Sequence, residues 1–196
     1  MIRQRSVILG LIGWLLIVPS AWATSYAIDP DHTTVSFKIR HIFSRVEGTF
    51  NEFQGSFDYV PDHPEQWKAS ATIQAASIDT RVAKRDDHLR SPDFFDAATF
   101  PTITFTSAKV TDVTASSAKL LGLLTMHGVE KPVALDLVVH GEGKDPRGVL
   151  RSGFTATTTI HRKDFGLNWN KALESGQLLV GEDVEITLEV EGVAQP

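Results

Sequence analysis

Apolar and polar residues alternate along most of the chain, and this period of two is typical of β-strands with one buried face and one wet face. Residues 184–190 show it best, because Val, Ile, Leu and Val alternate there with Glu, Thr and Glu. The segments 133–139 and 35–39 repeat the pattern. Further strand segments are expected at Val46–Tyr59, Ser70–Ile78, Thr102–Val110, Lys119–Met126 and Val149–Ile160. The pattern predicts about eight strands.

Turn-forming residues separate these strands at positions 62–64, 127–129, 141–148 and 175–176. Short connections between strands imply antiparallel neighbours. The segment Val82–Arg90 instead has a composition that favours a helix, and the Ser-Pro pair after it ends that helix. The chain shows no long linker, no change in composition and no repeat, so residues 24–196 are predicted to form one domain.

Many antiparallel strands in one domain predict an all-β fold, either a sandwich or a closed barrel. We favour the barrel, because closure removes the exposed strand edges that invite aggregation. The interior of an eight-stranded barrel is either filled by side chains or holds one small ligand, as in lipocalins. The chain has 11 Phe and two Tyr, so most of its aromatic surface lacks a polar group and suits a dry cavity. The pattern alone leaves open that these Phe residues simply fill a core.

An outer-membrane barrel shows the same alternation, because periodicity does not say which way the apolar face points. The chain ends without a terminal aromatic residue, and its four Trp and two Tyr are few for two interfacial girdles. The predicted helix also interrupts the series of strands. These features favour a barrel with an apolar interior.

The first 23 residues have the organisation of an export signal. Residues 1–5 are basic, residues 7–18 are apolar, and Ala21-Trp22-Ala23 forms a small-x-small cleavage site. The alternative is an uncleaved anchor, which the apolar run disfavours because it falls below the usual ~20-residue span. We therefore predict a cleaved signal peptide at residues 1–23, a mature domain at residues 24–196 and a periplasmic location.

The chain of 196 residues carries 19 Lys and Arg against 24 Asp and Glu, a net charge of −5. It has no basic cluster of the kind that follows phosphates, which argues against nucleic acid and against anionic membrane surfaces as electrostatic partners. It contains no Cys, so thiol catalysis and Cys-ligated metal sites are excluded.

Catalytic motifs are missing from the sequence. There is no Gly-x-Ser-x-Gly elbow, no His-Glu-x-x-His and no Walker loop. Carboxylates and imidazole meet only at Asp86-Asp87-His88, where adjacent helical positions diverge too much for a shared metal. An ion pair between Asp86 and Arg90, four residues apart, is the simpler expectation. We predict no catalytic residue, no metal and no cofactor, and a protein that is not an enzyme.

Four blocks of sequence resemble those of the YceI-like family of exported, lipocalin-like, polyisoprenoid-binding proteins. The central block is His-Leu-Arg-Ser-Pro-Asp-Phe-Phe-Asp at 88–96, followed by Phe-Pro-Thr-Ile-Thr-Phe at 100–105. The others are residues 122–133, residues 162–170 with 179–184, and the opening Tyr-Ala-Ile-Asp at 26–29. The resemblance extends over nearly the whole chain after residue 24.

The resemblance implies an eight-stranded antiparallel barrel with one helical insert, whose apolar channel holds the isoprenoid tail of a lipid or quinone. It implies no catalysis. The expected ligand is therefore a polyisoprenoid or an isoprenoid quinone, which the protein sequesters or transports. Transient membrane contact for ligand exchange and formation of a homodimer are left open. The alternative is an envelope stress-related enzyme or interaction protein that uses the barrel for another ligand.

We expect inward-facing side chains of the strands to line the channel, with core packing as the alternative role for each of them. The expected lining residues are Phe37, Ile39, Phe50, Phe57, Ile73, Phe105, Leu123, Leu137, Val139, Phe154 and Ile186. Phe94 and Phe95 follow the predicted helix, and we expect one of them to close or line an end of the channel. Arg90, Arg162 and Asp164 are either head-group ligands or, the favoured role, structural residues that hold loops in place.

Overall fold

The computed structural model describes residues 23–196, so the predicted export signal lies outside the described residues except for Ala23. No helix in the described part of the chain is both long enough and apolar enough to cross a membrane.

The described residues form strands joined by short turns, one α-helix and three short 3₁₀ helices. The early strands are β1 (Thr24–Ile28), β2 (Thr34–His41), β3 (Ser44–Phe50), β4 (Phe53–Tyr59), β5 (Lys68–Gln74) and β6 (Ile78–Asp79). The later strands are β7 (Thr102–Thr111), β8 (Ser117–Met126), β9 (Val129–Lys144), β10 (Leu150–His161) and β11 (Val180–Ala194). The helices are η1 (Pro64–Gln66), η2 (Ala75–Ser77), α1 (Ala83–Arg90) and η3 (Arg162–Phe165).

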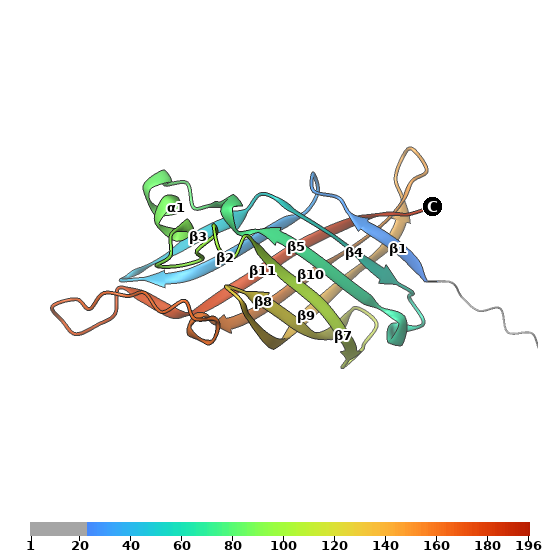
Figure 1. Cartoon of the computed structure of the whole chain (residues 1–196). Coiled ribbons are helices and arrows are strands. Elements are labelled where there is room, and N and C mark those ends of the chain that lie inside the picture. Colours follow the sequence, from blue (N-terminus) through green and yellow to red (C-terminus); the bar gives the residue numbers. More distant parts are fainter. Residues whose placement is uncertain (1–22) are drawn as a thin grey trace, which may run out of the picture.

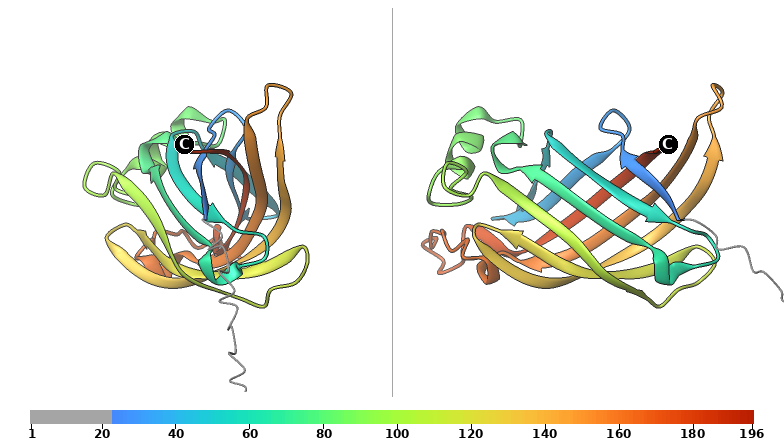
Figure 2. Two further views of the ribbon diagram at one scale, coloured as in Figure 1. Left: turned by 90° about the vertical axis from the view of Figure 1, so that its right-hand side faces the viewer. Right: turned by 45° about the vertical axis from the view of Figure 1, so that its right-hand side comes forward.

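The strands close into a barrel. The order β1-β4-β5-β7-β8-β9-β10-β11 returns to β1 through a direct β1–β11 pairing, and every pairing is antiparallel. Figure 2 shows the tilted strands wrapping around the central axis. The predicted eight-stranded antiparallel barrel with one α-helix is therefore confirmed.

Three rows of this barrel are interrupted. Strand β11 pairs with β2 along its first part and with β1 near its end, so β1 and β2 form one broken row. β3 and β4 form the next row, and β5 and β6 the one after it. The breaks in the last two rows lie side by side, because the Asn51 amide donates to Ser77 O and the Gln74 amide donates to Glu52 O.

The expected single strand Val46–Tyr59 is therefore two strands, β3 and β4. Phe50 and Phe53 both pack into the same core cluster although they lie three residues apart. A regular strand does not place residues three apart on one face, so the break at 51–52 shifts the phase of the alternation. The apolar pattern continues across the break, which is why periodicity did not reveal it.

Two turns behave differently from each other. At the β8–β9 hairpin, His127 and Gly128 both have positive φ (52° and 73°), as the predicted tight turn requires. The expected loop 141–148 is shorter than predicted, because β9 continues to Lys144. The remaining turn is held by Asp145 Oδ1, which accepts hydrogen bonds from the amides of Arg147 and Val149.

The helix α1 lies at one end of the barrel, beside β3 (Figure 1). The expected Asp86–Arg90 ion pair is wrong. Asp86 is buried and accepts hydrogen bonds from the amide and hydroxyl of Thr80, at 2.9 and 2.5 Å. Arg90 instead pairs with Asp87 at 3.2 Å and donates to the carbonyls of Ala76 and Ile78. These contacts attach the helix to η2 and β6.

The opposite end of the barrel is filled by side chains. Tyr26 on β1 and Phe57 on β4 are buried and stack with their rings 5.1 Å apart, and Phe154 meets Phe57 edge to face at 5.0 Å. A second cluster packs next to them and consists of Ala118, Leu120, Leu135, Leu137 and Ala156. The barrel is therefore closed by its own core where β1 and β4 meet. Figure 1 shows that β1 and β4 lie at the end away from α1.

Candidate functional site

A cavity of about 680 Å³ occupies the half of the barrel nearest α1. This volume lies within the roughly 300–1,000 Å³ of small-molecule sites. The cavity reaches the surface at the α1 end, because Val82 and Lys84 line it and are exposed. We call this opening, formed by α1, residues 91–100 and residues 166–180, the mouth.

The wall of the cavity is built mainly from alternate residues of eight strands, β2, β3, β5 and β7 to β11. On β2, Val35, Phe37 and Ile39 face inward, and they pair across the sheet with Leu188, Ile186 and Val184 of β11. The rest of the strand wall consists mainly of apolar side chains: Ala71, Ile73, Ile103, Phe105, Leu124, Met126, Val133, Leu135 and Ile160. A surface of this kind offers burial to a hydrocarbon chain and few polar groups to hold anything else.

Eight of the predicted lining residues lie on this cavity. They are Phe37, Ile39, Phe50, Ile73, Phe94, Phe95, Phe105 and Ile186. Phe50 sits between Phe37 and Phe95, with ring centroids 5.8 and 5.7 Å away. Phe95, which follows the helix in sequence, thus continues the wall of the barrel toward the mouth.

The other five predicted residues lie elsewhere. Phe57, Leu137, Val139 and Phe154 surround a separate hollow of about 30 Å³ at the filled end. These four side chains face inward, as predicted. Alternation does not say how far along the barrel axis a residue lies. The interior there is occupied by packed side chains, so these residues are core.

Leu123 points away from the cavity and is 42% exposed. Its neighbour Leu124 lines the cavity instead. Residues 120–124 are apolar on both faces of β8 except for Gly122, so the phase of the alternation cannot be taken from the sequence. The prediction for Leu123 is corrected to Leu124.

The mouth carries an aromatic cluster of His88, Phe94 and Trp169, of which the sequence predicted Phe94 alone at an end of the channel. The His88 ring meets the rings of Phe94 and Trp169 edge to face, at 5.0 and 4.9 Å, and Phe94 lies 5.1 Å from Trp169. Leu167, Leu179 and Val180 line the cavity beside it. The sequence cue to this part of the wall was the block 162–170, which resembled the family but showed no periodicity.

Arg162 of η3 lines the cavity and is only 2% exposed. Its Nε donates to Gly181 O at 2.8 Å, and its Nη1 donates to Leu167 O. Its Nη2 is buried and has no hydrogen-bond partner among the described residues. Burial lowers the pKa of Arg162. Of the three charged residues named from the sequence, Arg162 reaches the cavity, whereas Arg90 supports α1 and Asp164 is exposed.

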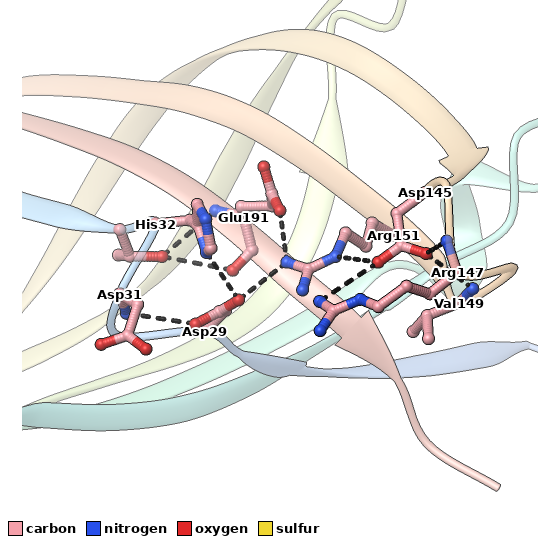
Figure 3. A network of polar contacts seen from close by, with 9 residues as sticks. Asp29, Asp31, His32, Asp145, Arg147, Val149, Arg151 and Glu191 are labelled. Atoms are coloured by element: carbon pink, nitrogen blue, oxygen red, sulfur yellow. Dashed lines mark hydrogen bonds and ion pairs between the residues drawn. The ribbon is translucent and has the colours of Figure 1, made fainter.

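A second polar cluster, drawn in Figure 3, lies outside the cavity. Ligand atoms of Asp29, His32 and Glu191 lie within 4.8 Å of one another. The Arg151 guanidinium already occupies this cluster, with Nη1 2.7 Å from Asp29 Oδ2 and 2.5 Å from Glu191 Oε1. Hydrogen bonds from Arg151 and His32 lower the pKa of Asp29 to about 2. The cluster is an ion-pair network that ties β1, β10 and β11 together.

The family model described as the YceI-like domain matches residues 26–192, which is most of the chain. The match includes every strand of the barrel and leaves out only the first two residues of β1 and the last two of β11. The chain belongs to the YceI-like family. The resemblance found in the sequence blocks is thereby confirmed.

Known proteins and solved structures match this chain over most of its length. A UPF0312 protein of Ectopseudomonas mendocina (strain ymp) is 41% identical over 188 residues, which cover 94% of this chain and 95% of that protein. BcnA of Burkholderia cenocepacia superposes with a TM-score of 0.75 at 24% identity, covering 84% of this chain and 98% of BcnA. A polyisoprenoid-binding domain from Saccharophagus degradans superposes with a TM-score of 0.63 at 17% identity, covering 87% and 98%. The two structural matches support the YceI-like barrel fold.

Proposed function

We propose that this protein binds the isoprenoid tail of a lipid or quinone inside the barrel and carries or stores it in the periplasm. The observation that carries the proposal is the cavity of about 680 Å³ with apolar strand walls. The solved polyisoprenoid-binding domain from Saccharophagus degradans shares the fold and supports the same class of ligand. The periplasmic location rests on the pattern of residues 1–23.

The wall of the cavity favours binding over catalysis. Its hydroxyl groups come from Ser36 and Thr158, and Ser36 Oγ donates to the Thr187 carbonyl at 2.9 Å. Neither hydroxyl has a hydrogen bond to a histidine or carboxylate among the described residues, as an activated nucleophile would need. A binding protein needs only the lined cavity, and that is what the barrel provides.

Burial of the tail supplies the driving force. Each CH₂ group removed from water contributes about 0.8 kcal/mol. Ordering a flexible tail and taking it out of a membrane offset most of that gain. We therefore expect binding that is firm but exchangeable, as a carrier requires.

The shape of the barrel sets the direction of the tail. The end that contains Tyr26 and Phe57 is closed by packed side chains, and the cavity opens beside α1. The tail therefore enters at the mouth and points toward the filled end, which leaves the head group of the ligand at the mouth.

The same end carries apolar side chains that face solvent. Phe43 is 91% exposed at the tip of the β2–β3 hairpin, which points to the α1 end (Figure 1). Val82, which precedes α1, and Leu178, which lies in the part of the mouth formed by residues 166–180, are also exposed. An exposed aromatic side chain at a hairpin tip suits insertion into the interfacial region of a membrane. We include in the proposal that this end contacts the membrane while the tail is exchanged.

Lipid extraction tests the proposed function. The full-length protein is expressed with its own residues 1–23, purified from the periplasm without detergent, and its extractable lipid is identified by mass spectrometry. We expect a prenyl lipid or quinone at a constant molar ratio to protein. Recovery of protein free of lipid that also fails to bind an added prenyl probe would overturn the proposal, whichever compartment it came from. Recovery of the mature protein in the cytoplasm would overturn the location alone.

A further inference from the structure

Every ionisable side chain that lines the cavity is basic. These residues are His41, Lys84, Arg85, His88 and Arg162, and none of the described lining residues is Asp or Glu. The chain as a whole has more acidic than basic residues, 24 against 19. The absence of carboxylates from the cavity therefore runs against the overall charge of the protein.

These basic groups gather at the mouth. Lys84, Arg85 and His88 lie on α1, and His41 ends β2. The segment after Arg162 meets α1 there, because the Trp169 ring lies 4.9 Å from the His88 ring. The head group of a tail bound in the cavity would lie among these side chains.

Arg85 is held in position by neutral oxygens. Its Nε donates to Thr80 Oγ1 at 2.7 Å, and its Nη2 donates to Thr80 O at 2.8 Å. Asp86, the nearest carboxylate in sequence, hydrogen bonds to Thr80 and does not line the cavity. The positive charge of Arg85 is thus fixed beside the mouth without an ion pair of its own in the described residues.

Arg162 is held in the same way. Two of its nitrogens donate to backbone carbonyls, and the third, Nη2, is buried without a partner. Among the five basic residues, His88 alone has a carboxylate partner within residues 23–196, Asp93 at 2.8 Å. A buried guanidinium with an unpaired donor is costly unless a ligand completes its hydrogen bonds.

We propose that the mouth binds an anionic head group, a phosphate or carboxylate, through Lys84, Arg85 and Arg162. This inference rests on the proposed function, since it concerns the polar end of the same tailed ligand. A guanidinium binds phosphate and carboxylate oxygens through charge-assisted hydrogen bonds, and both arginines are already oriented by carbonyl or hydroxyl oxygens. A neutral quinone ring would bring no negative charge to Lys84 and Arg85, which have no ion pair among the described residues.

The test compares two probes that share one tail. Geranylgeranyl monophosphate and geranylgeraniol are titrated separately into delipidated mature protein, and the fluorescence of Trp169 and the other tryptophans is followed. We expect the phosphate to bind about tenfold more tightly than the alcohol. The double variant Lys84→Gln/Arg85→Gln should lose most of this preference, measured as the ratio of the two affinities on one sample.

The matched control is Lys144→Gln/Arg147→Gln, which removes two exposed positive charges at the other end of the barrel. It should retain the full preference for the phosphate. Arg162→Gln should also lower the preference for the phosphate. The preference is measured as the ratio of the two affinities on one sample, so that a partly unfolded preparation does not distort the result. Equal affinity of the wild type for both probes would overturn the head-group inference and leave the proposed function standing. Failure of both probes to bind would overturn both.

Discussion

The Phe37 ring lies directly over Gly48, its partner on the neighbouring strand. A Cβ atom added to Gly48 would lie 2.5 Å from Phe37 Cζ, closer than real contacts allow. Phe37 lines the cavity and packs on Phe50. The glycine therefore provides the space that lets this ring lie against the wall.

We predict that Gly48→Ala will weaken tail binding, because the new methyl group must push the Phe37 ring from its place on the cavity wall. Overpacking of this kind costs about 1–3 kcal/mol of stability. Urea unfolding and titration with geranylgeraniol measure the two effects. Gly143→Ala is the control, since a Cβ there meets nothing within 4 Å. A Gly48→Ala protein with wild-type affinity would show that the ring does not shape the site.

Two adjacent leucines of β8 give a second prediction. Leu124→Trp should fill part of the cavity and reduce binding of the tail at least several-fold, whereas Leu123→Trp should leave affinity unchanged, because Leu123 faces solvent. Affinity is measured by titration, and thermal unfolding reports stability. Loss of stability in Leu124→Trp with full retention of binding would assign Leu124 to the core alone.

Phe43 provides a test of the membrane contact. Phe43→Ser should slow transfer of a prenyl probe between zwitterionic vesicles by roughly tenfold, because the side chain no longer enters the interface. Binding of a soluble short-chain prenyl probe should not change, since Phe43 is 91% exposed and does not line the cavity. Val113→Ser removes an exposed apolar side chain at the opposite end and should have no effect. Equal transfer rates for wild type and Phe43→Ser would argue against docking through this hairpin.

The ion-pair network at Asp29 predicts how stability depends on pH. Hydrogen bonds from Arg151 and His32 lower the pKa of Asp29 from 3.8 to about 2. A carboxyl group with a lowered pKa in the folded state stabilises the protein above pH 3.8, and this contribution is lost as the pH falls toward 2. Asp29→Asn should therefore lower stability at pH 7 and flatten the decline of stability between pH 4 and pH 2.

Urea unfolding midpoints at pH 7, 4, 3 and 2 measure this effect. Glu174→Gln is the control, because Glu174 is exposed and its side chain forms no hydrogen bond or ion pair with another described residue. A pH dependence of Asp29→Asn that runs parallel to the wild type would show that the Arg151 network contributes nothing to acid stability.

The alternation of apolar and polar residues determined much of the fold of this protein. It predicted the approximate strand segments and an all-β sandwich or barrel, because a half-buried strand must repeat its apolar residues every second position. The helix at 82–90 was predicted from its composition and the Ser-Pro pair after it, and the resemblance to the YceI-like family implied the eight-stranded barrel. It also identified six side chains on the cavity, among them Phe37 and Ile186, which are paired across β2 and β11. Phe94 and Phe95 were predicted from their place after the helix. These are properties of local pattern, and the chain displays them directly.

The tertiary structure alone decided where along the barrel the interior is hollow. Phe57 and Phe105 both face inward, yet Phe57 is core at the filled end and Phe105 lines the cavity. It also decided which side chains of β8 face the cavity, Leu124 and not Leu123. It placed Arg162 and residues of α1 on the same cavity. The physical reason is that position along the axis depends on strand tilt and register, which are set by pairing between segments distant in sequence and leave no mark on the alternation within any one strand.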